Sequence, residues 1–322
     1  MNHRPISKLW HRFQQFGGFP LIGAYFRMGL GGALVRQGWR LLCRRTDADH
    51  AYTAIRHEAN KRLTAQYAPY IAERKRHYDA LTLDQHRSNK VWTCWLQGFS
   101  HAPHMVQVCQ ESMRRLLTDR DIIQVDADNY RQYATLPDLI TKRYERGQMP
   151  PALFSDLLRL ELLINHGGTW MDASMLCTGY EAQRKLFDCD LFMFQHFRKN
   201  DRQFEIASNW FITACTNNRL LLVLRDVLTE YWRTHTVTLN YYMFHDFFKA
   251  VAALYPDETA AMPRKNRLLP LLLAPQLGKP YNAQWMADLT TRCCFHKLNY
   301  RVGQALENTR GTFYSVLFNE EE

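Results

Sequence analysis

From residue 90 onward, short apolar runs typical of strands alternate with longer amphipathic runs typical of helices. Strands are predicted at residues 91–96, 122–125, 169–176, 190–194 and 209–214. Helices are predicted at residues 105–117, 137–146, 151–165, 218–233 and 241–254, and two Pro-flanked stretches, 268–273 and 276–281, are predicted as loop. This alternation indicates an α/β domain with a sheet flanked by helices.

The first 88 residues follow a different pattern. Residues 1–46 carry eight Lys or Arg among many aromatic and aliphatic residues, and no Asp or Glu. Residues 47–88 are polar and helix-prone. We therefore predict a basic, apolar helical arm (1–46), a helical lead-in (47–88) and a main domain (89–322).

The pattern of the arm fits neither a membrane-spanning helix nor a signal peptide. Arg27 keeps its apolar run below the roughly 18 uncharged residues that a membrane span needs. Three residues break up any signal-peptide core: Gly17, Gly18 and Pro20. Cationic and aromatic residues without acids are typical of helices lying on an anionic membrane. The alternative is an arm packed on the main domain, with its arginines in solvent.

The composition limits the partners that this chain can have. With 322 residues and 46% hydrophobic content, the chain is too apolar for a disordered protein. The net charge of +10 favours an anionic partner, either a membrane surface or a phosphorylated substrate. We expect no nucleic acid, because no nucleic-acid recognition motif accompanies the charge. The eight cysteines form no Cys-x-x-Cys pair, which favours free thiols in the cytosol.

The predicted helix 151–165 carries a charged pair within a run of leucines. Asp156 and Arg159 are three residues apart and therefore neighbours on one face of the helix. Because the helix is otherwise apolar, the pair either forms an internal ion pair or faces a functional site.

A double glycine and a carboxylate follow this helix. Gly167 and Gly168 permit a tight turn and a close approach of the backbone. Asp172 and Ser174 then alternate along the predicted strand and share one face. Carboxylate and hydroxyl oxygens are ligands that a hard divalent cation accepts, including one that also contacts a diphosphate.

Two other motifs compete for a role in chemistry. Asp126-x-Asp128 also follows a predicted strand, but no glycines precede it. His101-x-x-His104 has the spacing of metal ligands, yet it lies in a Pro-containing loop with no nearby cysteine. We interpret the first as a loop over the pocket and the second as structural.

The residues around the double glycine resemble a known donor-sugar block. Ser155-Asp156-x-x-Arg159 followed by Gly167-Gly168-x-Trp170-x-Asp172 resembles the block of DXD-type glycosyltransferases with a GT-A fold, and more closely that of bacterial capsular polysaccharide synthesis proteins. Three further motifs agree in order: Val91-Trp92-x-x-Trp95-x-Gln97-Gly98, Asn209-Trp210-Phe211 and Phe295-His296-Lys297-Leu298. The resemblance covers about residues 90–300 and implies a GT-A-like mixed sheet flanked by helices.

The resemblance also implies a role for each matching position. Donor-binding roles fall to Trp92, Trp95, Gln97, Asp156, Arg159, Trp170 and Lys297. Asp172 would contact the ribose and a divalent cation, Mn²⁺ or Mg²⁺. Ser174 stands where the DXD pattern has its second Asp, and a hydroxyl supplies less charge than a carboxylate. The metal would therefore be held by Asp172, Ser174 and His296 together.

The function implied is a glycosyltransferase that moves a hexose from a nucleotide-diphosphate sugar, most simply a UDP-sugar, to a lipid-linked glycan acceptor with retention of configuration. Asp172 and Asp246 are the candidate catalytic residues, although Asp246 lies in an aromatic helix that also fits a core. The protein would act in surface polysaccharide synthesis, on the inner face of the cell membrane. The alternative is a catalytically degenerate GT-A-like protein that binds the membrane surface, which Ser174 favours.

Overall fold

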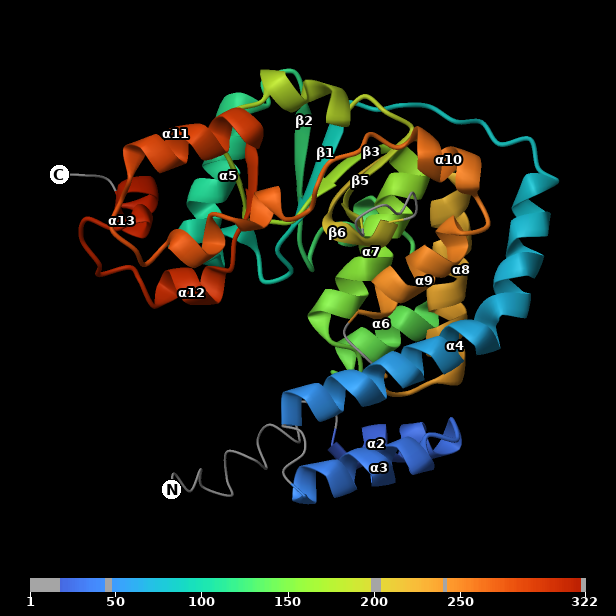
Figure 1. Cartoon of the computed structure of the whole chain (residues 1–322). Helices are drawn as coiled ribbons and strands as arrows, with labels where there is room; N and C mark the ends of the chain where they lie inside the picture. Colours follow the sequence, from blue (N-terminus) through green and yellow to red (C-terminus); the bar gives the residue numbers. More distant parts are fainter. Residues whose placement is uncertain (1–17, 44–47, 198–203, 240–241, 320–322) are drawn as a thin grey trace.

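The computed structural model describes residues 18–43, 48–197, 204–239 and 242–319 (Figure 1). The arm predicted at residues 1–46 therefore lies partly outside the described residues. The described chain combines one mixed sheet with helices on both of its faces, and with an N-terminal helical segment. The predicted α/β fold, with its mixed sheet flanked by helices and its N-terminal helices, is confirmed.

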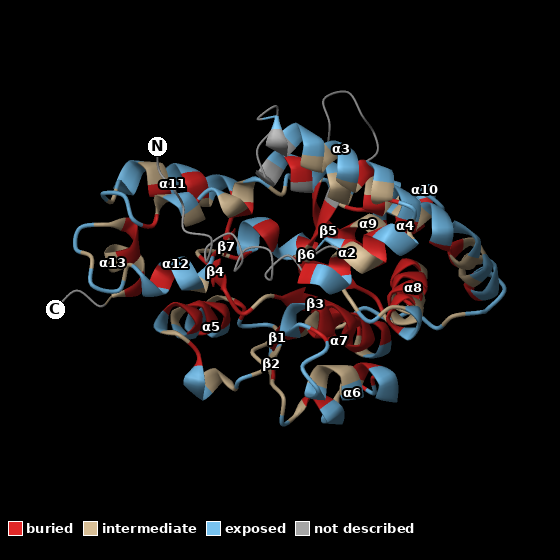
Figure 2. Cartoon of the chain, turned by 90° about the horizontal axis from the view of Figure 1, so that it is seen from below, coloured by how far each residue is buried: buried red, intermediate tan, exposed pale blue. Residues whose placement is uncertain are grey.

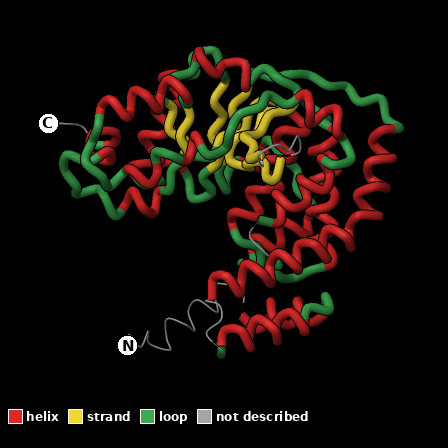
Figure 3. The backbone as a smooth tube through the Cα atoms, viewed as in Figure 1, coloured by secondary structure: helices red, strands yellow, loops and turns green. Residues whose placement is uncertain are grey.

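The central sheet has five strands (Figure 3). They are β1 (Lys90–Cys94), β2 (Asp121–Val125), β3 (Gly168–Met171), β5 (Leu191–Phe197) and β6 (Phe204–Ala214), in the order β2-β1-β3-β6-β5. β1 pairs in parallel with both β2 and β3, whereas β6 runs antiparallel to β3 and β5. The carboxyl ends of the three parallel strands consequently meet at one edge of the sheet, which is where α/β proteins place their ligands.

Alternating side chains of the strands enter two different cores. In β1, Val91 belongs to one apolar cluster and Trp92 to the other, and in β3 the same holds for Met171 and Trp170. This period of two is what a sheet covered on both faces requires. The helical cover comes from α5 (His104–Leu116), α6 (Asp138–Glu145), α7 (Pro151–His166), α8 (Arg219–Thr234), α9 (Met243–Ala252) and α10 (Pro256–Ala261). Figure 2 shows that α7 is buried along most of its length.

A second sheet, of two strands, lies beside the edge where the parallel strands β1, β2 and β3 end. β4 (Met175–Cys177) pairs antiparallel with β7 (Phe295–Lys297). Around this sheet lie α5 and the C-terminal helices α11 (Ala283–Arg292), α12 (Tyr300–Gln304) and α13 (Phe313–Phe318). The sequence pattern predicted one strand at 169–176, but the structure has two, separated by a turn in which the Met175 N–H donates to the Asp172 carbonyl at 3.0 Å.

The N-terminal segment packs on a long helix. α4 (Ala48–Asp79) is a single helix of 32 residues, and α2 (Gly18–Arg27) and α3 (Gly31–Leu42) lie beneath it in Figure 1. Leu21, Tyr25 and Leu30 join the same apolar cluster as Leu63 and Tyr67 of α4. One face of the arm is thus part of the core.

The structure also bears on membrane spans and on thiols. Among the described residues, no helix combines the length and the apolar character needed to cross a bilayer. All eight cysteines are free thiols.

Candidate active site

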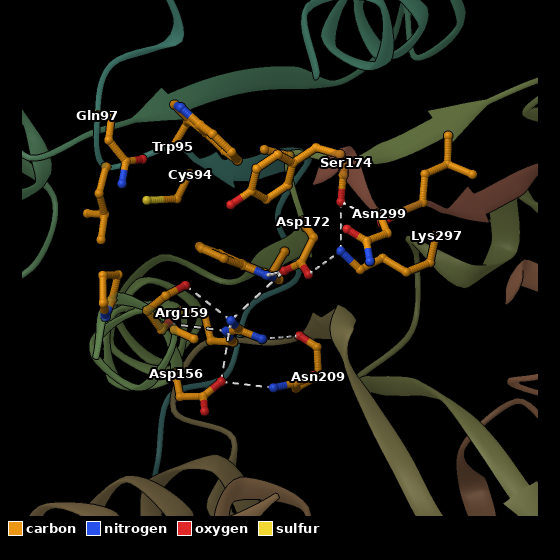
Figure 4. Close-up of a pocket in the computed structure, with 18 of the residues that line it drawn as sticks. Cys94, Trp95, Gln97, Asp156, Arg159, Asp172, Ser174, Asn209, Lys297 and Asn299 are labelled. Atoms are coloured by element: carbon orange, nitrogen blue, oxygen red, sulfur yellow. Dashed lines mark hydrogen bonds and ion pairs between the residues drawn. The ribbon is translucent and has the colours of Figure 1, made fainter. Parts of the chain in front are cut away.

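A pocket of about 760 Å³ lies at the edge of the sheet where β1 and β3 end. Its walls come from segments far apart in the sequence: the end of β1 and the loop after it, the N-terminal half of α7, the end of β3 and the turn after it, the middle of β6, and the end of β7 with the chain that follows (Figure 4). The lining includes Trp95, Gln97, Ser155, Asp156, Arg159, Trp170, Asp172, Ser174, Asn209, Lys297, Asn299, Tyr300 and Arg301.

Arg159 is buried and lies at the base of the pocket, where its polar neighbours accept hydrogen bonds or carry negative charge. Nε donates to the Ser155 carbonyl at 3.1 Å, Nη2 donates to the Ser155 hydroxyl at 3.1 Å, and Nη1 donates to the Asn209 carbonyl. Nη2 also lies 3.3 Å from Asp156 and 3.9 Å from Asp172. A guanidinium in such a cage fixes the two carboxylates relative to each other.

Asp156 is nearly inaccessible to solvent, and its Oδ1 accepts a hydrogen bond of 2.9 Å from the Asn209 amide. Burial raises the pKa of the Asp156 carboxyl to about 6, because Arg159 and Asn209 offset only part of the lost solvation. Asp156 therefore titrates at the acid end of the physiological range.

Asp172 reaches the pocket from the turn after β3 and is held by two hydrogen-bond donors. Trp170 Nε1 donates to Oδ1 at 2.9 Å, and the Lys297 ammonium donates to Oδ2 at 2.9 Å. Burial raises the pKa of Asp172, but the charges of Lys297 and Arg159 outweigh it and hold the pKa below its ordinary value. Asp172 is accordingly a carboxylate at neutral pH and stays ionised to lower pH than Asp156 next to it.

Lys297 closes the opposite wall. Its Nζ lies 2.9 Å from Asp172 Oδ2 and 2.7 Å from Ser174 Oγ, so the ammonium sits between the two side chains of the Asp-x-Ser motif (Figure 4). The Ser174 hydroxyl in turn donates to the Leu298 carbonyl at 3.1 Å. The β4–β7 pairing produces this arrangement, because it places Lys297 opposite Met175.

The aromatic side chains predicted at the site divide into two groups. Trp95 and Trp170 line the pocket, Trp95 making an edge contact with Tyr300 at 5.1 Å between ring centroids. The Arg159 guanidinium lies 4.8 Å from the centre of the Trp170 ring. Trp92 does not line the pocket: it is buried in the core, where its Nε1 donates to the Gly167 carbonyl at 2.9 Å.

The predicted metal ligands do not come together as a set. His296 points away from the pocket because it alternates with Lys297 along β7, and its Nε2 lies 2.9 Å from the Thr178 hydroxyl. Burial lowers the pKa of the His296 imidazole to about 4. Within the described ranges, no three His, Cys, Asp or Glu side chains form a metal-binding group. Asp172 and Ser174 remain, and both already bind the Lys297 ammonium, so this donor set does not fit a divalent cation.

Asp246 is placed on α9, outside the residues that line the pocket. Its neighbour His245 is buried, and burial lowers the pKa of the His245 imidazole to about 3. In the His101-x-x-His104 motif, His104 Nε2 bonds the Phe318 carbonyl, and His101 Nδ1 lies 3.1 Å from the Ser100 hydroxyl.

Sequence reasoning gave no role to several residues of the pocket. Ser155 and Asn209 were part of recognised motifs. Ser155 contacts Arg159 within α7, whereas the contacts of Asn209 with Arg159 and Asp156 depend on the approach of β6 to α7. Asn299, Tyr300 and Arg301 follow β7 and were not singled out. The one available signal was their position directly after the His-Lys-Leu motif.

Comparison with curated proteins and solved structures gives distant likenesses at most. Among curated proteins, none matches this chain. One similar solved structure is named "PaToxG Glycosyltransferase"; it is 12% identical, with 64% of this chain and 82% of that chain covered and a TM-score of 0.38. So distant a likeness carries neither a substrate nor a mechanism over to this chain.

The family comparison extends over most of the chain. The model of the family described as "Capsular polysaccharide synthesis protein" matches residues 46–317. This match begins well before residue 90, so it includes α4, which the sequence motifs left unexplained. The chain therefore belongs to the capsular polysaccharide synthesis protein family.

Proposed function

We propose that this protein is a GT-A-type glycosyltransferase that moves a hexose from a nucleotide-diphosphate sugar to a lipid-linked glycan acceptor in surface polysaccharide synthesis. The observation that supports this most is the pocket at the carboxyl ends of β1 and β3, with Asp156, Arg159, Asp172 and Lys297 in one bonded cluster. Family membership supports the polysaccharide context. A UDP-sugar is the first donor to test.

The pocket offers both an apolar surface and positive charge to such a donor. Trp95 and Tyr300 provide aromatic faces beside Gln97, which suits a nucleoside or a sugar ring. Lys297 and Arg301 line the same pocket and can pair with a diphosphate. Arg159 is buried and each of its three nitrogens already has a protein partner, so its role is to position Asp156 and Asp172.

The chemistry that follows is transfer on the front face of the sugar. The bond between the anomeric carbon and the diphosphate oxygen breaks, and its electron pair leaves with the diphosphate, which Lys297 stabilises. The acceptor hydroxyl forms the new bond from the same side and gives its proton to the departing phosphate oxygen. The anomeric configuration is thereby retained. Asp172 orients Lys297 and faces the reacting region as a carboxylate.

The test is turnover. The purified protein is incubated with UDP-, GDP-, CDP- and ADP-sugars, and release of the nucleoside diphosphate is followed with and without a membrane extract that contains glycolipid acceptors. We expect slow hydrolysis of one donor that the acceptor fraction accelerates. Absence of both binding and hydrolysis for every donor would contradict the proposal.

We also propose that the protein is cytoplasmic and attaches to the inner face of the membrane through α2 and α3. These two helices expose Phe26, Val35 and Trp39, each more than half accessible. Arg36 and Arg40 are exposed on the same segment, and residues 1–46 contain no acid. Each cation near an anionic bilayer contributes about 1 kcal/mol, and the aromatic residues add burial in the interface.

Vesicle binding tests this attachment without disturbing the core. The triple variant Phe26→Ser, Val35→Ser and Trp39→Ser should lose sedimentation with anionic vesicles, while neutral vesicles bind neither protein. A matched control changes three exposed hydrophobic residues elsewhere: Leu81→Ser, Leu254→Ser and Leu268→Ser. Equal loss in both variants, or none in the first, would refute the arm as the membrane contact.

Ser174 favours a second candidate, a membrane-binding protein whose GT-A-like domain has lost catalysis. Replacement of an acid by a hydroxyl at this position removes charge that a metal would need. The donor assay and the vesicle assay separate the two functions, because this second candidate binds vesicles but turns over no nucleotide sugar.

A further inference from the structure

The position of the Lys297 ammonium explains why the residues around it do not fit a metal. Nζ is 2.9 Å from Asp172 Oδ2 and 2.7 Å from Ser174 Oγ, the two atoms that a divalent ion would share. An ion bound to both oxygens would lie within about 5 Å of the ammonium and would be repelled by it. The Ser174 hydroxyl proton is directed to the Leu298 carbonyl, so the serine accepts from Lys297 without rearrangement.

The acidic side chains of the pocket already have cationic partners without a metal. Two carboxylates, Asp156 and Asp172, face two cations, Arg159 and Lys297, at contact distance. Arg301 adds a third positive charge to the lining. A site with two unpaired acids carries excess negative charge, which attracts a divalent cation. This pocket carries excess positive charge, which attracts an anion.

We infer that Lys297 takes the place of the divalent cation in this protein, so that a nucleoside diphosphate binds and leaves without a metal. This inference rests on the proposed function and specifies how its donor is held. Asp172 and Ser174 are then positioning residues for the ammonium. Two of its three N–H donors bind them, and among the described residues the third has no partner, which leaves it for a phosphate oxygen.

A metal dependence measured on the wild-type protein tests the inference without any variant. The full-length protein is freed of metal with EDTA, and the binding of UDP, GDP, CDP and ADP is measured by calorimetry in EDTA and in Mn²⁺. We expect one of these to bind with affinities that agree within about twofold in the two buffers. Binding that requires Mn²⁺ would overturn the inference and leave the proposed function standing. Absence of binding in both buffers would overturn the proposed function itself.

Two further measurements locate the effect on Lys297. Lys297→Met keeps the length of the side chain without its charge, and should bind the same nucleoside diphosphate at least tenfold more weakly in EDTA. Lys142→Met on α6 is the matched control, because Lys142 is an exposed lysine paired with Asp138. Unchanged affinity in Lys297→Met would overturn the inference.

Mn²⁺ alone provides the complementary measurement, read by electron paramagnetic resonance. We expect the signal of free Mn²⁺ to persist when wild-type protein is added. If wild-type protein removes the free Mn²⁺ signal and the Asp172→Asn variant does not, a metal binds at the Asp-x-Ser motif and the inference is overturned. Thermal unfolding of each variant confirms that it is folded.

Discussion

Two acidic motifs of nearly the same composition follow parallel strands on either side of β1. Asp126-Ala127-Asp128 follows β2, and Asp172-Ala173-Ser174 follows β3. By sequence the first is the more complete Asp-x-Asp pair. In the structure only the second lines the pocket.

The first motif serves its own loop. Asp126 Oδ1 accepts the backbone N–H groups of Asp128 and Asn129, both at 3.0 Å. The Asn129 amide completes the turn by donating to the Gln124 carbonyl at 3.0 Å. This is the ordinary use of an aspartate at a strand end, where a side chain satisfies backbone donors.

The second motif is bound by side chains from other parts of the fold. Asp172 accepts from Trp170 and Lys297 and lies 3.9 Å from Arg159, so α7, β3 and β7 all converge on it. The difference follows from strand position. β2 is an edge strand, whereas β3 lies between β1 and β6 and therefore has neighbours on both sides. A motif becomes a site where several elements meet at the end of a central strand.

Of the substitutions that test this comparison, Asp172→Asn is expected to have the largest effect on activity. The change removes the carboxylate that orients the Lys297 ammonium, while leaving the size of the side chain the same. We expect kcat/KM for transfer to fall by roughly 10³-fold, the scale of losing a preorganised electrostatic contact. The measurement is initial rate against donor concentration, with circular dichroism to verify the fold. A variant within tenfold of wild type would remove Asp172 from the active site.

A smaller effect, with a distinct pH signature, is expected from Asp156→Asn. Because burial raises the pKa of Asp156 to about 6, wild-type kcat/KM should decline as pH falls through about 6, when Arg159 loses a charged partner. The variant should be roughly tenfold to hundredfold less active at neutral pH through misplacement of Arg159. Its profile should lack the limb near pH 6. Persistence of that limb in the variant would assign the titration to another group.

The same substitution carries a stability signature of known sign. The folded pKa of Asp156 lies above its ordinary value of 3.8, so between pH 3.8 and about 6 the folded chain holds a proton that the unfolded chain has released. The contribution of this group to the free energy of unfolding therefore rises as pH falls from about 6 toward 3.8. Urea unfolding at several pH values should show this rise in wild type and a flatter dependence in Asp156→Asn.

Much of the fold could be predicted because its signals are local. The helix at 151–165, with Pro151 at its start and Gly167 after its end, matches α7 closely. The turn at Asp172 was missed, because an apolar and polar alternation continues through it and gives no sign of the break between β3 and β4. The helices after residue 263 are short, and packing against other elements rather than propensity determines them.

The sequence could identify individual residues of the site but not the contacts between them. Asp156, Arg159 and Asp172 could be chosen because a charge in an apolar helix and an acid after a double glycine stand out in the sequence. The ligand role of His296 depends on which face of β7 enters the pocket, and a strand of three residues leaves that unspecified. The contact of Lys297 with Ser174 spans 123 residues and follows from the β4–β7 register, which no local pattern encodes.

The smallest effect on activity is expected from Asp126→Ala, which tests whether the motif after β2 also takes part in transfer. The variant loses the acceptor for two backbone N–H groups of the loop, which should lower the free energy of unfolding by about 1 kcal/mol. Transfer activity should stay within about threefold of wild type, because Asp126 contacts neither Lys297 nor Arg159. Urea unfolding and initial rates measure the two quantities. A loss of activity comparable to that of Asp172→Asn, at unchanged stability, would mean that the motif after β2 also acts on the donor.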